Sequence, residues 1–396
     1  AERPDAQSAD VPLQQLPQDT TAQPATSTQP AAQQTEEDAV PDSLRLRRKF
    51  GDFAPVAQGQ ARAIRVTTEH LKLQLSTLGG MPQPVYLQKH QTHDSLPLPV
   101  FPDGPQNYAS FRLRHTDKNG GARIIDTRNL YYTASNTGPI NLQGKKKQTL
   151  SLKAELAPGK YLEHEYTFYG DRPHVGYTFR LVGMEEFLPD NFYELNAGIE
   201  IPQTEQNGEN QKRETTLAWK LKGESGTEEL DDFDDEVPEP ERAPTPVKWF
   251  AFKSQFFSTA FISEDGYDYG TFRANYPEKE GHIKRMSATA TVPYDRGNTD
   301  EAHFTLYFGP NDLYLMDDYG VELQKLVQLG WGPIRYVNTL VILPVFNFLE
   351  GYVTSNYGLI IFVLALFIKI ILSPLTWKSH KSMAKMQVVN KMDEMK

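Results

Sequence analysis

Leucines and polar residues alternate in short runs through the middle of the chain. In HLKLQLSTLGG (70–80), every second residue from Leu71 to Leu75 is a leucine, lysine and glutamine stand between them, and a glycine pair ends the run. YLEHEYTFYGD (161–171) alternates in the same way. Short alternating segments separated by turn residues are typical of β-strands. We therefore expect residues 49–310 to form one large antiparallel β-sandwich domain.

The apolar period becomes helical after this region. LYLMDDYGVELQKLVQLGW (313–331) has apolar residues at roughly helical spacing, as has WGPIRYVNTLVILPVFNFLEGYV (331–353). The second segment carries one stripe at steps of three and four, made of Ile334, Val337, Val341, Val345, Phe348 and Tyr352. We expect residues 311–353 to form connecting helices and then an amphipathic one.

Aromatic residues at its two ends suggest where this amphipathic helix lies. Trp331 and Tyr352 bracket it, Arg335 is on the polar side, and Pro344 predicts a kink. This pattern favours a helix in the outer membrane–water interface. The alternative is a second membrane span, against which its proline and polar residues weigh.

The longest apolar run is NYGLIIFVLALFIKIILSPLT (356–376), which only Lys369 interrupts with a charge. As a helix, its 21 residues would measure roughly 30 Å, about the thickness of a hydrocarbon core. We assign residues 354–376 to a transmembrane helix and expect Pro374 to mark its end or a kink. The alternative, a buried helix of a soluble domain, would need a core that hides every face.

Charge and composition differ between the two ends of the chain. Residues 1–48 are rich in Gln, Ala, Thr, Pro, Asp and Ser, which predicts a disordered periplasmic linker. Six lysines against Asp393 and Glu394 give residues 354–396 a net charge of +4, so the other 353 residues carry −14 of the total of −10. By the positive-inside rule, residues 1–353 lie outside the membrane and residues 377–396 lie in the cytoplasm.

Composition also limits the chemistry. The 396-residue chain has no cysteine, which excludes disulfides and thiolate metal sites, and its acidic balance argues against nucleic-acid binding. His90 and His93 could share one side of a helical turn and bind a metal, but no third ligand stands out. The acidic run 226–244 lacks the spacing of an EF-hand loop, so a solvated loop is the simpler interpretation. We expect no catalytic residue, cofactor or metal.

Several motifs in this chain resemble those of the YidC insertase family, the bacterial branch of the Oxa superfamily. They are Gly330-Trp331, GLIIFVLALFIKIILSPLT (358–376) and KSMAKM (381–386) in the tail, and LSTLGG (75–80), VKWFAFKSQFF (247–257) and YFGP (307–310) before it. Two details resemble Bacteroidota-type members. One is the Trp-x-Ala-Phe-Lys sequence that begins at Trp249, and the other is Lys369 in the span.

This resemblance implies a fold and an activity. The membrane would be the bacterial inner membrane, so residues 1–353 would be periplasmic. The periplasmic domain would be a galactose-mutarotase-like β-supersandwich, and residues 377–396 would begin a cytoplasmic helical hairpin. Complete members have an initial anchoring span and five core spans, so we expect this chain to be a fragment without the first and the last spans. The family inserts, folds and assembles inner-membrane proteins without making or breaking a bond. Its partners would be nascent membrane proteins, the lipid bilayer, the Sec translocon and the ribosome.

The resemblance also gives Lys369 a role. The family's cytosol-facing hydrophilic groove has a basic residue, usually arginine, at the matching position. On a helix, Lys369, Ser373 and Thr376 share one face, so the three are candidates for the groove wall. Two alternatives stay open. Lys369 could snorkel to the inner headgroups, and the chain could be a membrane-tethered carbohydrate-binding or mutarotase-like protein, which a histidine–glutamate pair in one cleft would support.

Overall fold

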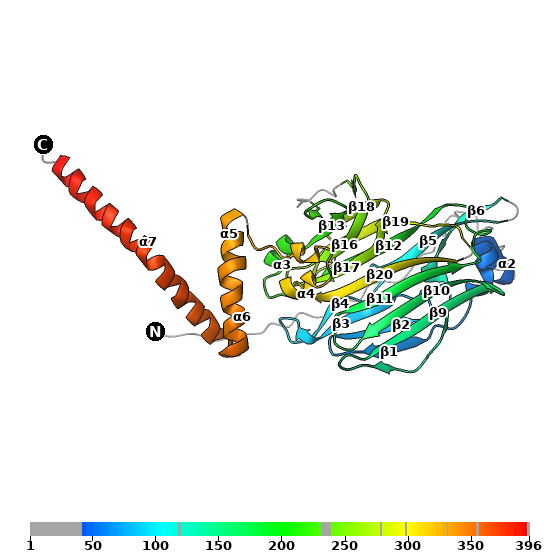
Figure 1. The fold of residues 1–396 in the computed structure, drawn as a ribbon. Helices are drawn as coiled ribbons and strands as arrows, with labels where there is room; N and C mark the ends of the chain where they lie inside the picture. Colours follow the sequence, from blue (N-terminus) through cyan, green and yellow to red (C-terminus); the bar gives the residue numbers. More distant parts are fainter. Residues whose placement is uncertain are drawn as a thin grey trace, which may run out of the picture.

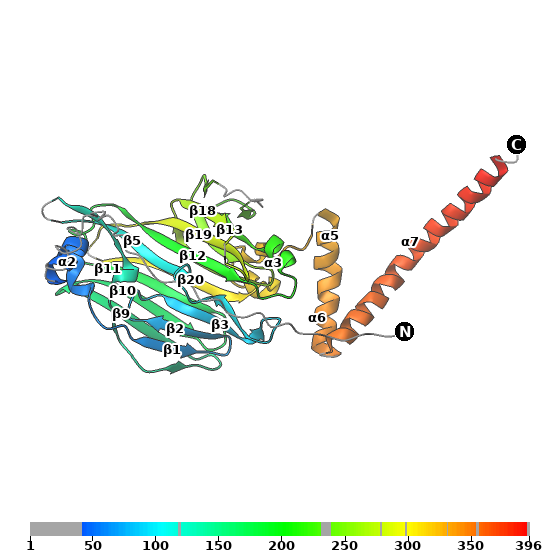
Figure 2. The same ribbon diagram turned by 180° about the vertical axis from the view of Figure 1, so that it is seen from behind.

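The computed structural model describes residues 42–117, 120–230, 239–277, 279–297, 299–330, 332–353 and 356–393. Strands β1 to β20, which we call the β body, pack into one elongated unit (Figure 1). Helices α5 (Gly332–Val337), α6 (Leu343–Tyr352) and α7 (Tyr357–Asp393) lie beyond one end of it, and α2 (Asp42–Phe50) lies at the other end (Figure 2). The fold is therefore mainly β with a helical tail, which confirms the predicted fold class.

The β body consists of three sheets. The first contains, in spatial order, β4 (Pro97–Phe101), β3 (Pro82–Gln91), β2 (Leu71–Ser76), β1 (Ala63–Thr67) and β8 (Ile140–Asn141). The second contains β14 (Glu228–Glu229), β13 (Thr216–Leu221), β16 (Val247–Lys253), β17 (Phe257–Tyr267), β20 (Thr299–Pro310), β11 (His174–Val182), β10 (Lys160–Tyr169), β9 (Lys147–Ala157) and β7 (Thr133–Ala134). The third contains β15 (Glu241–Arg242), β18 (Gly270–Asn275), β19 (His282–Pro293), β12 (Phe192–Pro202), β5 (Tyr108–Thr116) and β6 (Ala122–Asp126). Neighbouring strands are antiparallel apart from the short β1–β8 pair.

Alternation in the sequence becomes alternation of burial in the strands. Leu71, Leu73 and Leu75 of β2 are buried and the residues between them are not. Strand β16 differs, because nearly all of its side chains are buried. Both faces of this strand are covered, which is why VKWFAFK reads as a continuous apolar run.

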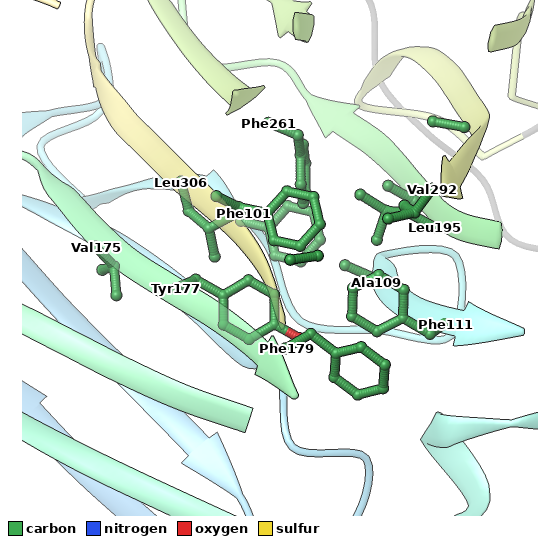
Figure 3. Packing of buried hydrophobic residues seen from close by; sticks show 14 of the residues in the cluster. Phe101, Ala109, Phe111, Val175, Tyr177, Phe179, Leu195, Phe261, Val292 and Leu306 are labelled. Atoms are coloured by element: carbon green, nitrogen blue, oxygen red, sulfur yellow. The ribbon is translucent and has the colours of Figure 1, made fainter. Parts of the chain in front are cut away.

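Aromatic side chains fill the main core between the nine-stranded and six-stranded sheets. Phe111 of β5 stacks on Phe179 of β11, with ring centroids 4.1 Å apart, and both side chains are fully buried. Leu195 of β12 and Leu306 of β20 point into the same space (Figure 3). This core supplies most of the buried apolar surface that stabilises the β body.

A second apolar cluster covers the outer face of the nine-stranded sheet. It joins Trp249 of β16 and Tyr307 of β20 to Met316, Leu323 and Leu326. These last three belong to α4 (Leu313–Asp317) and the 3₁₀-helix η3 (Leu323–Leu326). We call residues 313–327 the clamp, because they hold the start of the helical tail against the sheet.

The clamp corrects the expectation of a helical period throughout 313–331. Met316 and Leu323 are buried, as their spacing suggested, but the helix is interrupted between Asp318 and Glu322. Gly320 and Glu322 both adopt left-handed backbone conformations there, with φ of 65° and 61°. A right-handed helix cannot continue through such residues.

The N-terminal boundary also differs from the prediction. Residues 1–41 of the predicted linker lie outside the described residues, but Asp42–Phe50 forms helix α2, followed by the 3₁₀-helix η1 (Gly51–Val56). Phe50 is buried and Leu46 packs partly against the main core. Tertiary contacts thus order a basic segment whose composition alone did not predict a helix. The remaining short helices are η2 (Thr127–Asn129) and α3 (Gly208–Glu214).

The tail contains three helical segments and then one long helix. Helix α5 (Gly332–Val337), the π-helix η4 (Asn338–Ile342) and α6 (Leu343–Tyr352) form one rod across the end of the β body. Helix α7 (Tyr357–Asp393) then runs obliquely away from it (Figure 1). Helix α7 continues beyond Pro374, so this residue does not end the helix.

Candidate functional site

Helix α7 exposes an apolar surface. Among the described residues, it is the one helix long and apolar enough to cross a membrane, over Tyr357–Pro374, and 6% of that stretch is buried. Phe362 is 65% exposed, and Ile361, Leu366, Ile370 and Ile371 are exposed with it. The residues that the structure describes therefore do not cover this helix, as a soluble core would.

Lys369 stands on this apolar helix with an exposed side chain. No hydrogen bond or ion pair joins it to any other residue that the structure describes. Ser373 and Thr376, also exposed, follow at i+4 and i+7 and so lie on the same face. The residues predicted for the groove wall thus form one polar stripe along α7.

The hydroxyl of Ser373 also explains why α7 continues through Pro374. A proline has no backbone N–H, so Pro374 cannot donate to the carbonyl of Ile370 four residues earlier. The Ser373 Oγ donates to that carbonyl instead, at 2.9 Å. Thr376 Oγ1 donates to the carbonyls of Leu372 and Ser373, at 3.2 and 2.9 Å. The Ser373 hydroxyl therefore satisfies the one helix carbonyl that Pro374 leaves without a backbone donor.

The α5–α6 rod carries the residues predicted for the membrane interface. Arg335, Pro344 and Tyr352 are exposed, whereas Trp331 lies outside the described residues. The π-helix ends immediately before the turn that contains Pro344, so the helix is irregular next to the residue where we expect a kink. Several large apolar side chains of the rod are exposed, namely Ile334, Tyr336, Val337, Leu340 and Phe348.

A small buried contact fixes the corner between α6 and α7. Leu349 and Ile360 are buried against the corner, and the Phe346 and Tyr357 rings stack at 6.3 Å. The Tyr357 hydroxyl donates to Glu350 Oε1 at 2.8 Å. The direction of α7 relative to the rod is thereby set by side chains of both helices.

The clamp ties the tail to the β body through polar contacts as well as apolar ones. The Trp249 indole N–H donates to the Val321 carbonyl at 2.8 Å. Glu322 forms ion pairs with Lys220 at 2.8 Å and with Lys325 at 2.6 Å. Hydrogen bonds from these two lysines lower the pKa of Glu322 to about 2. Sequence reasoning missed this junction, although the two-sided apolar pattern of β16 was a usable signal for it.

Candidate metal sites find no support in the described residues, which contain no cluster of three or more metal-ligating side chains. His90 lies in strand β3, not in a helical turn, and its ring contacts Phe257 at 5.1 Å. His93 bonds to the Thr204 carbonyl at 3.2 Å. Within the acidic run 226–244, residues 231–238 lie outside the described part of the chain.

One histidine–glutamate pair bears on the carbohydrate alternative. His282 Nε2 lies 3.7 Å from Glu200 Oε1, but Arg285 already pairs with the other carboxylate oxygen of Glu200. The Glu200 carboxylate of β12 is thus shared between two side chains of the neighbouring strand β19.

Distant likenesses exist among solved structures. A galactose mutarotase related enzyme from Lactobacillus acidophilus aligns with a TM-score of 0.39 and 12% identity, over 62% of this chain and 97% of its own. A putative aldose 1-epimerase from Escherichia coli K12 aligns with a TM-score of 0.38 and 8% identity, over 63% of this chain and 99% of its own. Likenesses this remote support no conclusion about activity.

Curated sequences are much closer. A protein named membrane protein insertase YidC from Parabacteroides distasonis is 29% identical over 363 residues, which cover 88% of this chain and 55% of that protein. The protein of the same name from Porphyromonas gingivalis strain W83 is 28% identical, with 89% and 56% covered. The chain thus spans about half the length of these relatives. The family model described as YidC periplasmic domain matches residues 63–335, more than half of the chain. This chain therefore belongs to the YidC periplasmic domain family.

Proposed function

We propose that this chain is part of an insertase that places newly made proteins into the bacterial inner membrane. Relatives named membrane protein insertase support this assignment, as does an apolar helix that the protein leaves uncovered. In this proposal residues 49–310 are a periplasmic domain. The linker 1–48 precedes it, and the last residues of this linker belong to α2, which packs on the domain through Leu46. Residues 354–376 cross the membrane, and 377–396 begin a cytoplasmic helical hairpin.

Its working surface is the polar stripe of Lys369, Ser373 and Thr376. The observation that carries the proposal is an exposed lysine without a described partner on an otherwise apolar helix. A charge within a membrane span is costly unless it faces protein or water. The stripe would form one wall of a hydrophilic groove, where it stabilises a polar segment of the substrate while the substrate's apolar helix moves into lipid. No bond is made or broken, so the activity is not enzymatic.

The α5–α6 rod would lie in the outer membrane–water interface. Its exposed apolar side chains, with Arg335, Pro344, Tyr352 and Trp331, fit the headgroup region. The substrates would be nascent membrane proteins, and we propose the Sec translocon and the ribosome as partners that deliver them.

Exchange of the groove lysine tests this function. We expect chromosomal Lys369→Glu and Lys369→Ala to reduce insertion of substrates with acidic external tails, because the charge draws the acidic segment into the groove. Lys369→Arg should retain insertion, since both side chains supply a positive charge. The measurement is protease protection of pulse-labelled substrates in spheroplasts, at equal insertase levels.

Phe367→Ala is a matched control, because Phe367 is an exposed residue on the opposite face of the same helix, two residues before Lys369, and its replacement changes no charge. It should insert all substrates normally. Snorkelling predicts a different result, because removing the charge would make the span more apolar and leave insertion intact. If Lys369→Ala inserted several substrates normally, Lys369 would be only a membrane anchor, and its proposed role in the groove would be refuted.

A further inference from the structure

Four loops at one end of the β body form a continuous hydrogen-bonded rim. His93, in the β3–β4 turn, donates its backbone N–H to Thr204 in the loop after β12. Gln211 of α3 accepts from the Thr204 N–H at 2.9 Å and donates to Ser254 Oγ at 3.2 Å. Asn311, just before α4, donates to the Ser254 carbonyl at 3.0 Å. We call these loops, residues 92–96, 203–211, 254–257 and 311–314, the proximal rim.

The proximal rim carries exposed large apolar side chains from three separate loops. Leu96 is 57% exposed, Phe256 is 50% exposed and Tyr314 is 50% exposed. The rim holds two of them in place, because the Asn311 N–H bonds to the Phe256 carbonyl at 2.8 Å and Asp312 caps the N-terminus of α4 beside Tyr314. None of the three adds to the core, so the fold does not account for their apolar character.

The position of the rim indicates what it meets. The chain leaves the rim through the clamp and continues into the α5–α6 rod, and α3 and α4 lie at the end of the β body that faces the rod (Figures 1 and 2). Beyond the rim, every helix of the tail exposes apolar side chains. A single exposed apolar residue needs no explanation. These three, however, lie together at the end of the β body from which the chain continues into the apolar tail.

We propose that the proximal rim rests on the lipid headgroups of the outer leaflet, with Leu96, Phe256 and Tyr314 inserted among them. This inference rests on the proposed function, which puts the rod in the same headgroup layer. Aromatic rings such as those of Phe256 and Tyr314 suit this layer, and the tyrosine hydroxyl can stay in contact with water. The β body would then stand end-on on the bilayer, held both by the tail and by its own loops.

Site-specific labels can measure the depth of each loop, because the chain contains no cysteine. Leu96→Cys, Phe256→Cys and Tyr314→Cys, each in the whole chain, receive a nitroxide and are reconstituted into phosphatidylethanolamine–phosphatidylglycerol vesicles. Power-saturation spectra compare the access of oxygen, which concentrates in lipid, with that of a water-soluble nickel chelate. Ile124→Cys is the matched control, since Ile124 is 60% exposed and lies on β6, at the opposite end of the β body. A label at Phe362→Cys in α7 is the reference for a position in the hydrocarbon core of the membrane.

We expect the three rim labels to lose access to nickel relative to the Ile124 label, and the Phe362 label to lose it further. A rim label as accessible to nickel as the Ile124 label, with Phe362 in hydrocarbon, would overturn the inference and leave the proposed function intact. A Phe362 label accessible to nickel would instead contradict the membrane span itself.

Discussion

The β body and the helical tail treat apolar side chains in opposite ways. In the β body, large aromatic residues such as Phe111, Phe179 and Trp249 are fully buried. In α5–α7, phenylalanine and tyrosine residues are largely exposed, with Phe348 at 59% and Phe362 at 65%. Both regions are rich in aromatic and aliphatic residues, but the β body buries these side chains and the helical tail exposes them.

This contrast shows that the two regions are built for different solvents. In water, exposed apolar area is unfavourable, so the β body buries it between sheets. A spanning helix satisfies its backbone hydrogen bonds internally and leaves its apolar side chains to lipid. The hydroxyl of Ser373 follows the same rule, because it satisfies a carbonyl that Pro374 leaves unbonded. The clamp is where the water-adapted region is joined to the lipid-adapted one.

The largest effect should come from one matched pair of phenylalanine truncations. Phe111→Ala removes a ring that lies between two sheets and contacts Phe179 at 4.1 Å and Tyr193 at 5.3 Å. We expect it to destabilise the β body by about 3–5 kcal/mol, through lost burial and the cavity left behind. Denaturant unfolding of the detergent-solubilised chain, followed by near-ultraviolet circular dichroism, measures the change.

Phe362→Ala is the other half of the comparison. Its ring is mostly exposed, so the unfolding midpoint of the β body should not change. Equal losses from the two substitutions would mean that α7 packs on the β body, and the contrast between the regions would fail.

A smaller effect should follow from a buried histidine. His164 is fully buried among aromatic rings, and its Nδ1 lies 2.6 Å from the Tyr177 hydroxyl. Burial lowers the pKa of His164 to about 3. The unfolded chain therefore binds a proton more readily than the folded one below pH 6.5, and stability falls as pH falls from about 6.5 to 3. At pH 5 the loss from this residue should be about 2 kcal/mol relative to pH 7.

His164→Gln isolates that contribution. The substitution is expected to lower stability at every pH, so the measured quantity is the difference in unfolding free energy between pH 7 and pH 5. That difference should be smaller in the variant by the histidine's share. His174→Gln serves for comparison, because burial also lowers the pKa of His174, to about 4. An unchanged pH dependence in His164→Gln would show that His164 is hydrated in solution.

The strands and the long apolar helix could be predicted because each follows from a local period. Alternating leucines specify β2, and an uninterrupted apolar run specifies α7. Helix α2 could not be predicted, because its order depends on Phe50 reaching a core that is distant in sequence. The break in 313–331 was also hidden, since Glu322 adopts a left-handed conformation held by ion pairs to Lys220 and Lys325.

The candidate site, too, could be predicted from the sequence only in part. Helical spacing alone predicts that Lys369, Ser373 and Thr376 share a face. The structural use of the Ser373 hydroxyl needed three-dimensional contacts, because a sequence does not state which carbonyl it reaches. The proximal rim could not be predicted from the sequence either, because its loops are far apart in the chain and meet only after folding.

The smallest effect should appear at the clamp, where the two regions join. The Glu322 carboxylate bridges Lys220, whose side chain is 7% exposed, and the more exposed Lys325. Glu322→Gln removes the charge and leaves Lys220 buried with the Glu224 carbonyl as its remaining described partner. The glutamate is itself partly exposed, so the pair should stabilise docking of the clamp by no more than about 1 kcal/mol. The loss is therefore expected in local opening of the clamp and not in the unfolding of the β body.

Trp249 is a natural reporter of this opening, because its indole N–H bonds to Val321 within the clamp. With fluorotryptophan incorporated, Glu322→Gln should accelerate exchange of that indole proton at pH 7, measured by nuclear magnetic resonance. Glu301→Gln is the matched control, since it breaks an Arg180 ion pair of 2.7 Å on the same sheet but away from the clamp.

Because the pKa of folded Glu322 lies near 2, below its ordinary 4.5, its contribution is complete above pH 4.5 and is lost as pH falls towards 2. The wild type and Glu322→Gln should therefore become indistinguishable at the acidic end. Identical exchange at pH 7 would mean that the apolar contacts of Met316, Leu323 and Leu326 hold the clamp without help from charge.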